Sequence, residues 1–540
     1  MPTPAKGQIG LVLENLTTPG LASLLPATSV GATMSLTTQP SGSSGMRLLI
    51  YVYGHTASGT ITIAGKDING NAQTEPVINV PAQTPGLQSV FVSKFEYETV
   101  DVFSSVNASG ITTTGLTNGT IVIQGIQAPK YMIAGTLKSK AKYDTYRPNE
   151  HRNTFDKNTR SLQLIKKVAV DELKTCLYPR DSIWVGYMAF GSVPTITTLP
   201  VSPTSLLAAT AVSGSPLSLT TQPTAPGMAL ILTIASSTVV GTIAIAGQDV
   251  YGNAQNETII TNAGGTNGNG TYYSQNIWKS VNASGITNTG NTTGTLAVTG
   301  VFAWKYVWNP GDVLYSACLE KFTGVDTFSM PWVWMDEFTF DLAAQKELMV
   351  TAKGLSQDRT VIGDRTVTTL SSSRATSLGS PTDLPVAGWQ TLVYLDATAG
   401  AIPTTAFADV EELKFTFKNP AEPKWTLTNT QNYNRLNRGK REVALEAKLD
   451  LTNVLQLEQY RYFSLQYMTF QFVGQSIGGG NNEQWQFSFP VRIDDFDMES
   501  MPDKTNVEAT VKLTPELDTA GLGSSFKVTV VTQMPPVYPL

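Results

Sequence analysis

One block of sequence occurs twice in this chain, and the duplication limits what the chain can fold into. Three motifs recur in the same order and at similar spacing. The first copy has LTTQP at Leu36–Pro40, GTITIAGKDINGNAQTE at Gly59–Glu75 and VNASGITTTG at Val106–Gly115. The second copy has LTTQP at Leu219–Pro223, GTIAIAGQDVYGNAQNE at Gly241–Glu257 and VNASGITNTG at Val281–Gly290. A block that is copied whole is expected to fold as one structural unit.

Each copy has the pattern of a β-sandwich. Copies of roughly 100 residues carry strand-like runs at a spacing of about 8–12 residues, separated by turn residues. Ile61 and Ile63 alternate with Thr60 and Thr62 before a turn at Asp67–Asn71. Asp67 could be a calcium ligand, but the repeated Asp spacing of an EF-hand is missing. The turn interpretation is therefore preferred, because Asp, Asn and Gly favour tight turns.

The sequence outside the copies also predicts strands. Within Arg441–Val473, the stretch Val443–Leu449 alternates apolar and polar residues, Asn453 can cap a helix, and Met468–Phe472 resumes the alternation. A period of two places one set of side chains on a buried sheet face. Two comparable sheet systems are expected, one that ends near Ala352 and one that runs from Val410 to Val531. Each contains a Phe-rich strand run followed by alternating residues that include Lys and Glu.

These patterns predict a mainly β fold with inserted modules. The expected division is a discontinuous host domain of residues 1–30, 131–200 and 305–405, two inserted Ig-like β-sandwich repeats at 31–130 and 201–304, and a second host domain at 406–540. Each host domain is expected to carry a small helix. The segment Gln357–Ala408 is expected to be a long polar connection.

Composition limits the class of protein. Charged residues make up 15% of the chain, below the ~25% of average globular proteins, and the net charge is −5, so the whole chain is not marked as a nucleic-acid binder. Cys176 and Cys318 are too few for a disulfide framework or a zinc site and are expected to be buried thiols. The apolar run Ile9–Leu13 is too short for a signal peptide or a membrane span, so assembly in a cytoplasm is expected.

The sequence contains no recognisable catalytic constellation. His55 and His151 lie in different units, and no phosphate-binding glycine loop follows a strand, so no enzyme activity, cofactor or metal is expected. Paired carboxylates can hydrolyse glycosides. An acidic loop or a subunit contact is the preferred interpretation of the acidic cluster at Asp494, Asp495, Asp497 and Glu499.

A basic run lies between the two copies. It could bind nucleic acid, or it could be a loop that docks on an acidic neighbouring subunit or ring. Docking is preferred because the chain as a whole is acidic. The candidate docking residues are Lys138, Lys140, Lys142, Arg147, Arg152, Lys157 and Arg160.

Two stretches resemble the sheet-forming core of tail tube (major tail) proteins of long-tailed bacteriophages. They are Tyr315–Arg359, YSACLEKFTGVDTFSMPWVWMDEFTFDLAAQKELMVTAKGLSQDR, and Val410–Val531, which includes Arg-Gly-Lys-Arg at Arg438–Arg441. The resemblance implies stacked rings whose inner sheets join into one β-barrel around a channel for DNA. It also implies a virion location, contacts with a tape measure protein and transient phage DNA, and no membrane. The repeats resemble Ig-like modules that decorate phage tails and capsids.

A conduit for DNA should not retain its cargo. Lys and Arg that neutralise phosphates give non-specific binding of ~10⁻⁴–10⁻⁶ M, which a neutral or acidic wall avoids. The candidate channel-lining residues are Glu442, Glu446, Glu508 and Thr510.

If both host domains are tube domains, three chains close a pseudo-six-fold ring. If only one is, six chains are needed.

Two other classes of function stay open. One is a virion decoration protein or adhesin whose repeats bind host-surface glycans. The other is a β-rich glycosidase, which the missing site disfavours.

Overall fold

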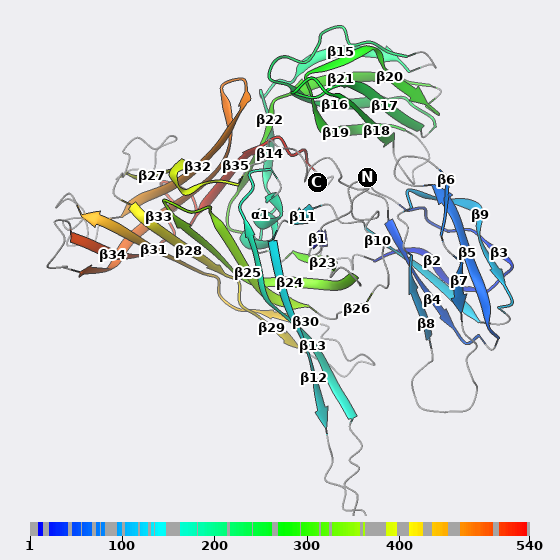
Figure 1. The fold of residues 1–540 in the computed structure, drawn as a ribbon, viewed down its shortest axis with the longest axis horizontal. Coiled ribbons are helices and arrows are strands. Elements are labelled where there is room, and N and C mark those ends of the chain that lie inside the picture. The colour runs from blue at the N-terminus through cyan, green and yellow to red at the C-terminus, as the bar shows by residue number, and fades with distance from the viewer. Residues whose placement is uncertain are drawn as a thin grey trace, which may run out of the picture.

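Strands dominate the chain, and the prediction of a mainly β fold is confirmed. The computed structural model describes residues 9–14, 21–40, 46–55, 57–66, 72–75, 77–80, 94–99, 103–116, 119–127, 131–133, 135–146, 162–180, 182–212, 216–239, 241–261, 268–291, 293–312, 315–322, 327–356, 360–361, 385–396, 410–424, 435–451, 465–499 and 507–536. Figure 1 shows a host sheet system with two sandwich modules beside it.

The host is organised around one antiparallel sheet of eight strands, here called the long sheet. Its order is β12 (Gly135–Tyr146), β13 (Leu162–Cys176), β25 (Met349–Ser356), β24 (Thr327–Ala343), β28 (Val410–Lys418), β31 (Glu442–Leu451), β34 (Val507–Pro515) and β33 (Asn481–Glu499). The β12–β13 hairpin reaches beyond the other described strands in Figure 1.

A second layer, here called the opposing sheet, covers one face of the long sheet. Its order is β27 (Thr391–Asp396), β32 (Gln466–Gly478), β33, β35 (Lys527–Thr532), β22 (Ala303–Trp308) and β14 (Thr195–Leu199). β33 belongs to both layers, because its first half pairs with β32 and β35 and its second half pairs with β34. One strand therefore ties the two layers together.

Stacked aromatic rings fill the space between the layers. The rings of Phe340 and Phe415 lie 4.5 Å apart, and Phe415 lies 4.9 Å from Phe487 of the opposing sheet. Phe417 contacts Phe526 at 5.2 Å. Each such pair adds about 0.5–1.5 kcal/mol beyond its buried area. The alternating Phe residues of the sequence thus form one core rather than a binding surface.

A short helix, α1 (Ile183–Phe190), is buried along its whole length inside this β-fold. A small helix was expected in the first host domain, and α1 lies within its residues 131–200. Its position was not predicted, because its sequence IWVGYMAF has no polar face and gives no helical periodicity. It ends at Gly191, whose left-handed φ of 67° suits glycine. A Cβ on Gly186 would lie 2.6 Å from the ring of Trp308. The helix predicted from Asn453 lies outside the described residues.

Smaller host strands complete the network. β1 (Ile9–Glu14) pairs with β11 (Tyr131–Ile133) and β23 (Ser316–Phe322), and β24 also pairs with β23 and β26 (Thr360–Val361). β29 (Ala421–Lys424) and β30 (Arg435–Arg438) form a separate hairpin. The expected polar connection at Gln357–Ala408 contains strands, since both β26 and β27 fall within it.

Each repeat forms a two-layered module with its own core. The first module, residues 21–127, has the sheet β2 (Leu21–Ser29), β10 (Thr120–Gln127), β4 (Met46–Tyr53), β8 (Lys94–Glu98) against β3 (Thr33–Met34), β9 (Ser105–Thr114), β5 (Gly59–Lys66), β6 (Ala72–Thr74) and β7 (Ile78–Val80). The second module, residues 204–301, has β15 (Thr204–Ala211), β21 (Thr295–Val301), β16 (Met228–Ala235), β19 (Gly270–Trp278) against β18 (Ala254–Thr261), β17 (Gly241–Gln248) and β20 (Ser280–Thr289).

Both modules replace the loop of a host hairpin. The first lies between β1 and β11, which pair with each other, and the second lies between β14 and β22, where Leu199 is opposite Ala303. The ends of each module are also neighbours, because Leu21 pairs with Ile126 and Thr204 with Gly300. Chain entry and exit are therefore adjacent, which lets a module be added without disturbing host strands.

The repeated motifs have a structural role in both modules. The backbone N–H of Val106 donates to Oε1 of Gln39 at 2.9 Å, and Val281 donates to Gln222 at the same distance. These contacts join LTTQP to VNASG. In the second module, Oδ1 of Asp249 accepts the backbone N–H groups of Tyr251 and Asn253, as the turn interpretation predicts. The equivalent Asp67–Asn71 of the first module lies outside the described residues.

The two modules differ in their contact with the host. Ile231 and Ile277 of the second module belong to the host core cluster, and Tyr273 packs edge-on against Trp304 at 6.2 Å. Cβ atoms on Gly478 or Gly479, at the tip of the β32–β33 hairpin, would meet the ring of Phe302. The described core of the first module forms a separate cluster.

The two host domains expected on either side of residue 405 share strand pairings and one core. β24 pairs with β28, and β22 pairs with β35, so strands from both sides of that boundary are hydrogen-bonded. One core cluster also includes residues from both sides.

We expect Gly186→Ala to destabilise the host. Alanine favours a helix by up to ~1 kcal/mol over glycine, but overpacking a full core costs about 1–3 kcal/mol. The measurement is the free energy of unfolding of the host transition. In a Trp308→Leu background, which makes room for the methyl group, the same change should cost less. Equal costs in both backgrounds would show that Trp308 is not the obstacle.

Candidate subunit-contact and channel-facing surface

The long sheet has one face against the core and one face outside it. On β31, Leu445 and Ala447 are buried, whereas Glu442, Ala444 and Glu446 are exposed. On β28, Phe415 and Phe417 are buried between exposed or partly exposed neighbours. The period of two along each strand produces this division. We call the exposed side the outer face of the long sheet.

Along two rows on the outer face, charges alternate in sign from strand to strand. One row runs across five strand pairings from β12 to β31 through Lys138, Glu172, Lys353, Glu337, Lys418 and Glu442. A second row runs from β24 to β33 through Asp341, Lys414, Glu446, Lys512 and Asp495. Opposite charges on facing strands stabilise a sheet by roughly 0.2–1 kcal/mol per pair.

Three of these pairs form short ionic contacts. Nζ of Lys138 lies 2.5 Å from Oε2 of Glu172, and this hydrogen bond lowers the pKa of Glu172. Nζ of Lys353 lies 2.7 Å from Oε1 of Glu337, which raises the pKa of Lys353. Lys512 and Asp495 approach to 2.9 Å.

The directions of the pKa shifts define the pH range in which these contacts stabilise the fold. The Glu172 contribution is present above its unfolded-state pKa and is lost as pH falls through the lowered value. The Lys353 contribution is present below its unfolded-state pKa and is lost as pH rises through the raised value. Both contacts therefore persist through the neutral range.

Three of the candidate channel-lining residues, Glu442, Glu446 and Thr510, share the outer face, but they do not form a purely acidic wall. Glu442 and Glu446 are exposed, with Lys418 opposite Glu442 and with Lys414 and Lys512 on either side of Glu446. Thr510 is partly exposed, and its neighbours across the sheet are Lys448 and Asp497. The backbone of Glu508 lies in β34 opposite Asp450, while its side chain lies outside the described residues.

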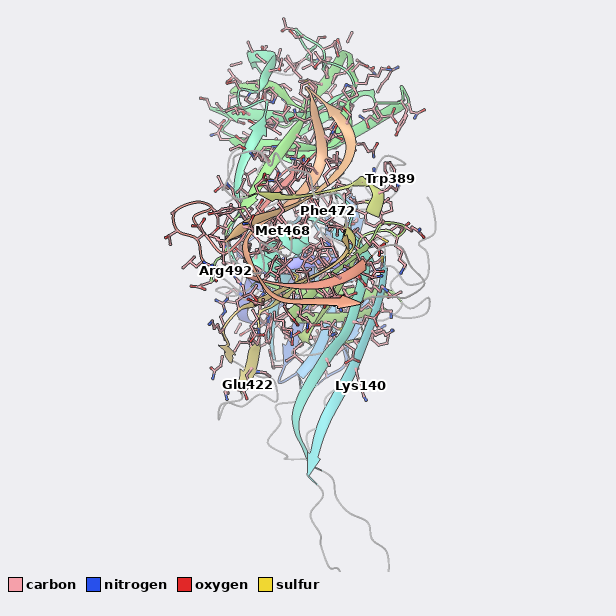
Figure 2. The ribbon with its side chains drawn as sticks, turned by 90° about the vertical axis from the view of Figure 1, so that its left-hand side faces the viewer. Lys140, Trp389, Glu422, Met468, Phe472 and Arg492 are labelled. Atoms are coloured by element: carbon pink, nitrogen blue, oxygen red, sulfur yellow. The ribbon has the colours of Figure 1, made fainter. Side chains whose placement is uncertain are left out.

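The candidate docking residues divide into two groups. Lys138 and Lys140 are exposed on β12, and Figure 2 shows Lys140 on the projecting hairpin. Lys142 belongs to the same strand, although its side chain is not described. The remaining candidates lie outside the described residues: Arg147, Arg152, Lys157 and Arg160. The basic run is therefore at least partly an edge strand rather than a loop.

The long sheet contains the same four-strand arrangement twice, here called the four-strand units. β12-β13-β25-β24 is matched by β28-β31-β34-β33 in pairing order. In each unit, the first two strands along the chain pair with each other, and so do the last two. The last strand along the chain, β25 or β34, also pairs with the second strand, β13 or β31.

Register and sequence agree with this correspondence. The β24–β25 pairing shifts between Met335 and Glu337, and the β33–β34 pairing shifts between Ile493 and Asp495. MDEF at Met335–Phe338 thus matches IDDF at Ile493–Phe496, and the contact of Lys353 with Glu337 matches that of Lys512 with Asp495. Likewise LKSKAK at Leu137–Lys142 matches LKFTFK at Leu413–Lys418. Both sequence matches are visible in the amino-acid sequence, but they were not among the predictions made from it.

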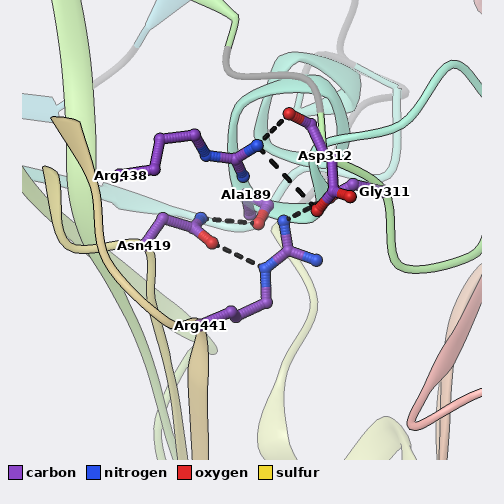
Figure 3. Close-up of polar contacts among 6 residues, drawn as sticks. All are labelled: Ala189, Gly311, Asp312, Asn419, Arg438 and Arg441. Atoms are coloured by element: carbon purple, nitrogen blue, oxygen red, sulfur yellow. Dashed lines mark hydrogen bonds and ion pairs between the residues drawn. The ribbon is translucent and has the colours of Figure 1, made fainter. Parts of the chain in front are cut away.

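A polar cluster joins the end of α1 to the long sheet (Figure 3). Nδ2 of Asn419 donates to the carbonyl of Ala189 at 2.9 Å, and Nε of Arg441 donates to Oδ1 of Asn419 at 2.6 Å. Nη2 of Arg441 also donates to the carbonyl of Gly311 at 2.8 Å. Asn419 therefore satisfies a carbonyl at the C-terminal end of the buried helix, and Arg441 holds Asn419 and places positive charge nearby, where it is favoured.

The other side chains considered for chemistry are possible metal ligands and the thiol of Cys176. No group of three or more His, Cys, Asp or Glu side chains there could hold a metal ion. Cys176 is partly exposed, and burial together with nearby Glu347 raises the pKa of its thiol to about 12. Such a thiol is weakly reactive at neutral pH.

Comparison with protein-family models gave no match, and comparison with curated proteins gave none. Among solved structures, the chain is similar to the PBSX exported protein XepA at 12% identity, over 54% of this chain and 85% of that chain, with a TM-score of 0.11. A TM-score of this size does not establish a shared fold. Within the described residues, no helix has both the length and the apolar character needed to cross a bilayer.

We expect a charge reversal in the middle of a row to lower the free energy of unfolding more than a reversal at its end. Lys353→Glu places a third acidic residue between Glu337 and Glu172 and should cost about 1–2 kcal/mol, because two attractive neighbours become repulsive. Lys138→Glu, with one such neighbour, should cost less than about 1 kcal/mol. The measurement is the free energy of unfolding at low and at 1 M salt, where screening should shrink both effects. Equal, salt-independent costs would contradict the row arrangement.

Proposed function

We propose that this chain is the major tail tube protein of a long-tailed phage, with a structural role in the virion. In this proposal three chains close a ring, and stacked rings enclose a channel through which DNA passes. The observation that carries the proposal is the long sheet, in which one chain supplies two copies of a four-strand unit joined edge to edge. A sheet built from repeated units, with strand edges left at both ends, is suited to closing on copies of itself.

The outer face of the long sheet supports a channel-lining role. Along the two charge rows its lysines alternate with carboxylates, so these rows offer no basic strip on which phosphates could collect. The field of such closely spaced opposite charges largely cancels within a Debye length of about 8–10 Å. Glu442, Glu446, Glu508 and Thr510 would contribute to this lining. A tape measure protein and DNA would be the passing partners.

The modules would decorate the outside of the tube. Their hairpin-loop positions and separate cores support this role, and host-surface glycans are candidate ligands. A second candidate function is an adhesin or decoration protein without a tube. The stacked rings of Tyr51 and Tyr53, which are partly exposed and 6.2 Å apart on the first module, favour it, because accessible aromatic rings can pack on sugars.

Purified protein viewed by negative stain tests the proposal. We expect hollow rings or tubes from the full chain. A variant with residues 21–127 replaced by a short Gly/Ser linker should assemble equally well, because Ile9–Leu11 already pair with Tyr131–Ile133. Isolated particles that bind cell surfaces would favour the second candidate function. Soluble, folded protein that forms neither rings nor tubes would contradict the tail tube proposal.

A further inference from the structure

The junction between the two four-strand units lies inside one chain and can be described residue by residue. β24 ends the first unit and pairs antiparallel with β28, which begins the second. Opposite positions are Glu337 and Lys418, Thr339 and Thr416, and Asp341 and Lys414. Acidic positions of the ending strand therefore face basic positions of the beginning strand.

The two ends of the long sheet repeat the same two strand types. β12 corresponds to β28 and begins the first unit, and the register opposes Lys138–Lys142 to β13 alone. β33 corresponds to β24 and ends the second unit. Among the described strands, its residues Asp495–Glu499 are paired only with β34. Within the part of the chain that the structure describes, one beginning strand and one ending strand thus lack a paired neighbour on their outer side.

We propose that the second half of β33 in one copy pairs antiparallel with β12 of the next copy, in the register of the β24–β28 junction. The inference rests on the proposed ring. Glu337 corresponds to Asp495, and Lys418 to Lys142, through the matched bulges and the matched LK motifs. The register then places Asp495 opposite Lys142, Asp497 opposite Lys140, and Glu499 opposite Lys138.

Charge complementarity supports this partner and this orientation. The ending edge carries three acidic residues at alternate positions, and the beginning edge carries three lysines at alternate positions. Backbone hydrogen bonds would supply most of the affinity, as in other cases of strand addition. The facing charges would select the register.

The same charges disfavour other contacts between copies. Two β12 edges would place lysines against lysines, and two β33 edges would place carboxylates against carboxylates. Like charges directly opposite each other destabilise a strand pair. The contact is therefore head-to-tail, which excludes a two-fold dimer and gives a closed ring where the rotation between copies closes, as in the proposed tube. It also explains both the basic run and the acidic cluster as two sides of one contact.

Cysteine cross-linking in the assembled protein tests the register. Asp497→Cys combined with Lys140→Cys in one chain should give disulfide-linked multimers on non-reducing gels, since directly opposite Cβ atoms lie about 4.5–5.5 Å apart. Variants that carry only one of the two introduced cysteines control for cross-links through Cys176 and Cys318. Asp497→Cys with Thr136→Cys, four residues away along β12, should remain unlinked.

Charge reversal gives an independent measure. Asp497→Lys or Lys140→Glu alone should raise the protein concentration needed for assembly on the order of tenfold, and the double reversal should restore it. Two outcomes would overturn this inference while leaving the tube proposal intact. In the first, tubes form but cross-link only through the offset pair. In the second, the concentration needed for assembly is unchanged by either charge reversal. Failure of the unmodified protein to form rings or tubes would overturn both.

Discussion

The structure depends on a simple constraint of antiparallel sheets: every strand edge must be paired, covered or blunted. Within the chain, the junction of β24 with β28 satisfies this constraint by placing the end of one four-strand unit against the start of the next. β33 then folds across the core and binds the opposing sheet through its first half. These two connections fix the aromatic core, since Phe340, Phe415 and Phe487 meet only when both are made. Among the described strands, what remains unpaired is one edge at each end of the long sheet.

The division of the long sheet into two faces follows from the same strands. Phenylalanines and aliphatic residues occupy one set of alternate positions, and lysines and carboxylates occupy the other. Because the signs alternate along the two charge rows, those rows gain cross-strand attraction without a net field of one sign. A surface with these properties is suited to contact with water and to passage of a polyanion, which a basic surface would retain.

The sequence was informative where local patterns decide the structure. Alternation identified strands such as Val443–Leu449, and the duplicated motifs identified both modules, because a period of two and a copied block are visible in one dimension. Burial of α1 was not predicted, since a helix that is apolar all round has no periodic signal. The pairing of Glu446 with Lys414 and Lys512 was also missed, because register between distant strands depends on tertiary structure. The polar contacts of Arg441 with Asn419 and Gly311 depend in the same way on segments far apart in the sequence.

The number of chains in one ring layer tests the central claim most directly. Two four-strand units per chain predict three chains with pseudo-six-fold symmetry, so native mass spectrometry of a soluble ring should give three times the chain mass of 58.0 kDa. Symmetry analysis of tube images should agree, with true three-fold and approximate six-fold repeats in cross-section. A ring of six chains with true six-fold symmetry would contradict the account, because the two units of one chain would then not occupy equivalent positions.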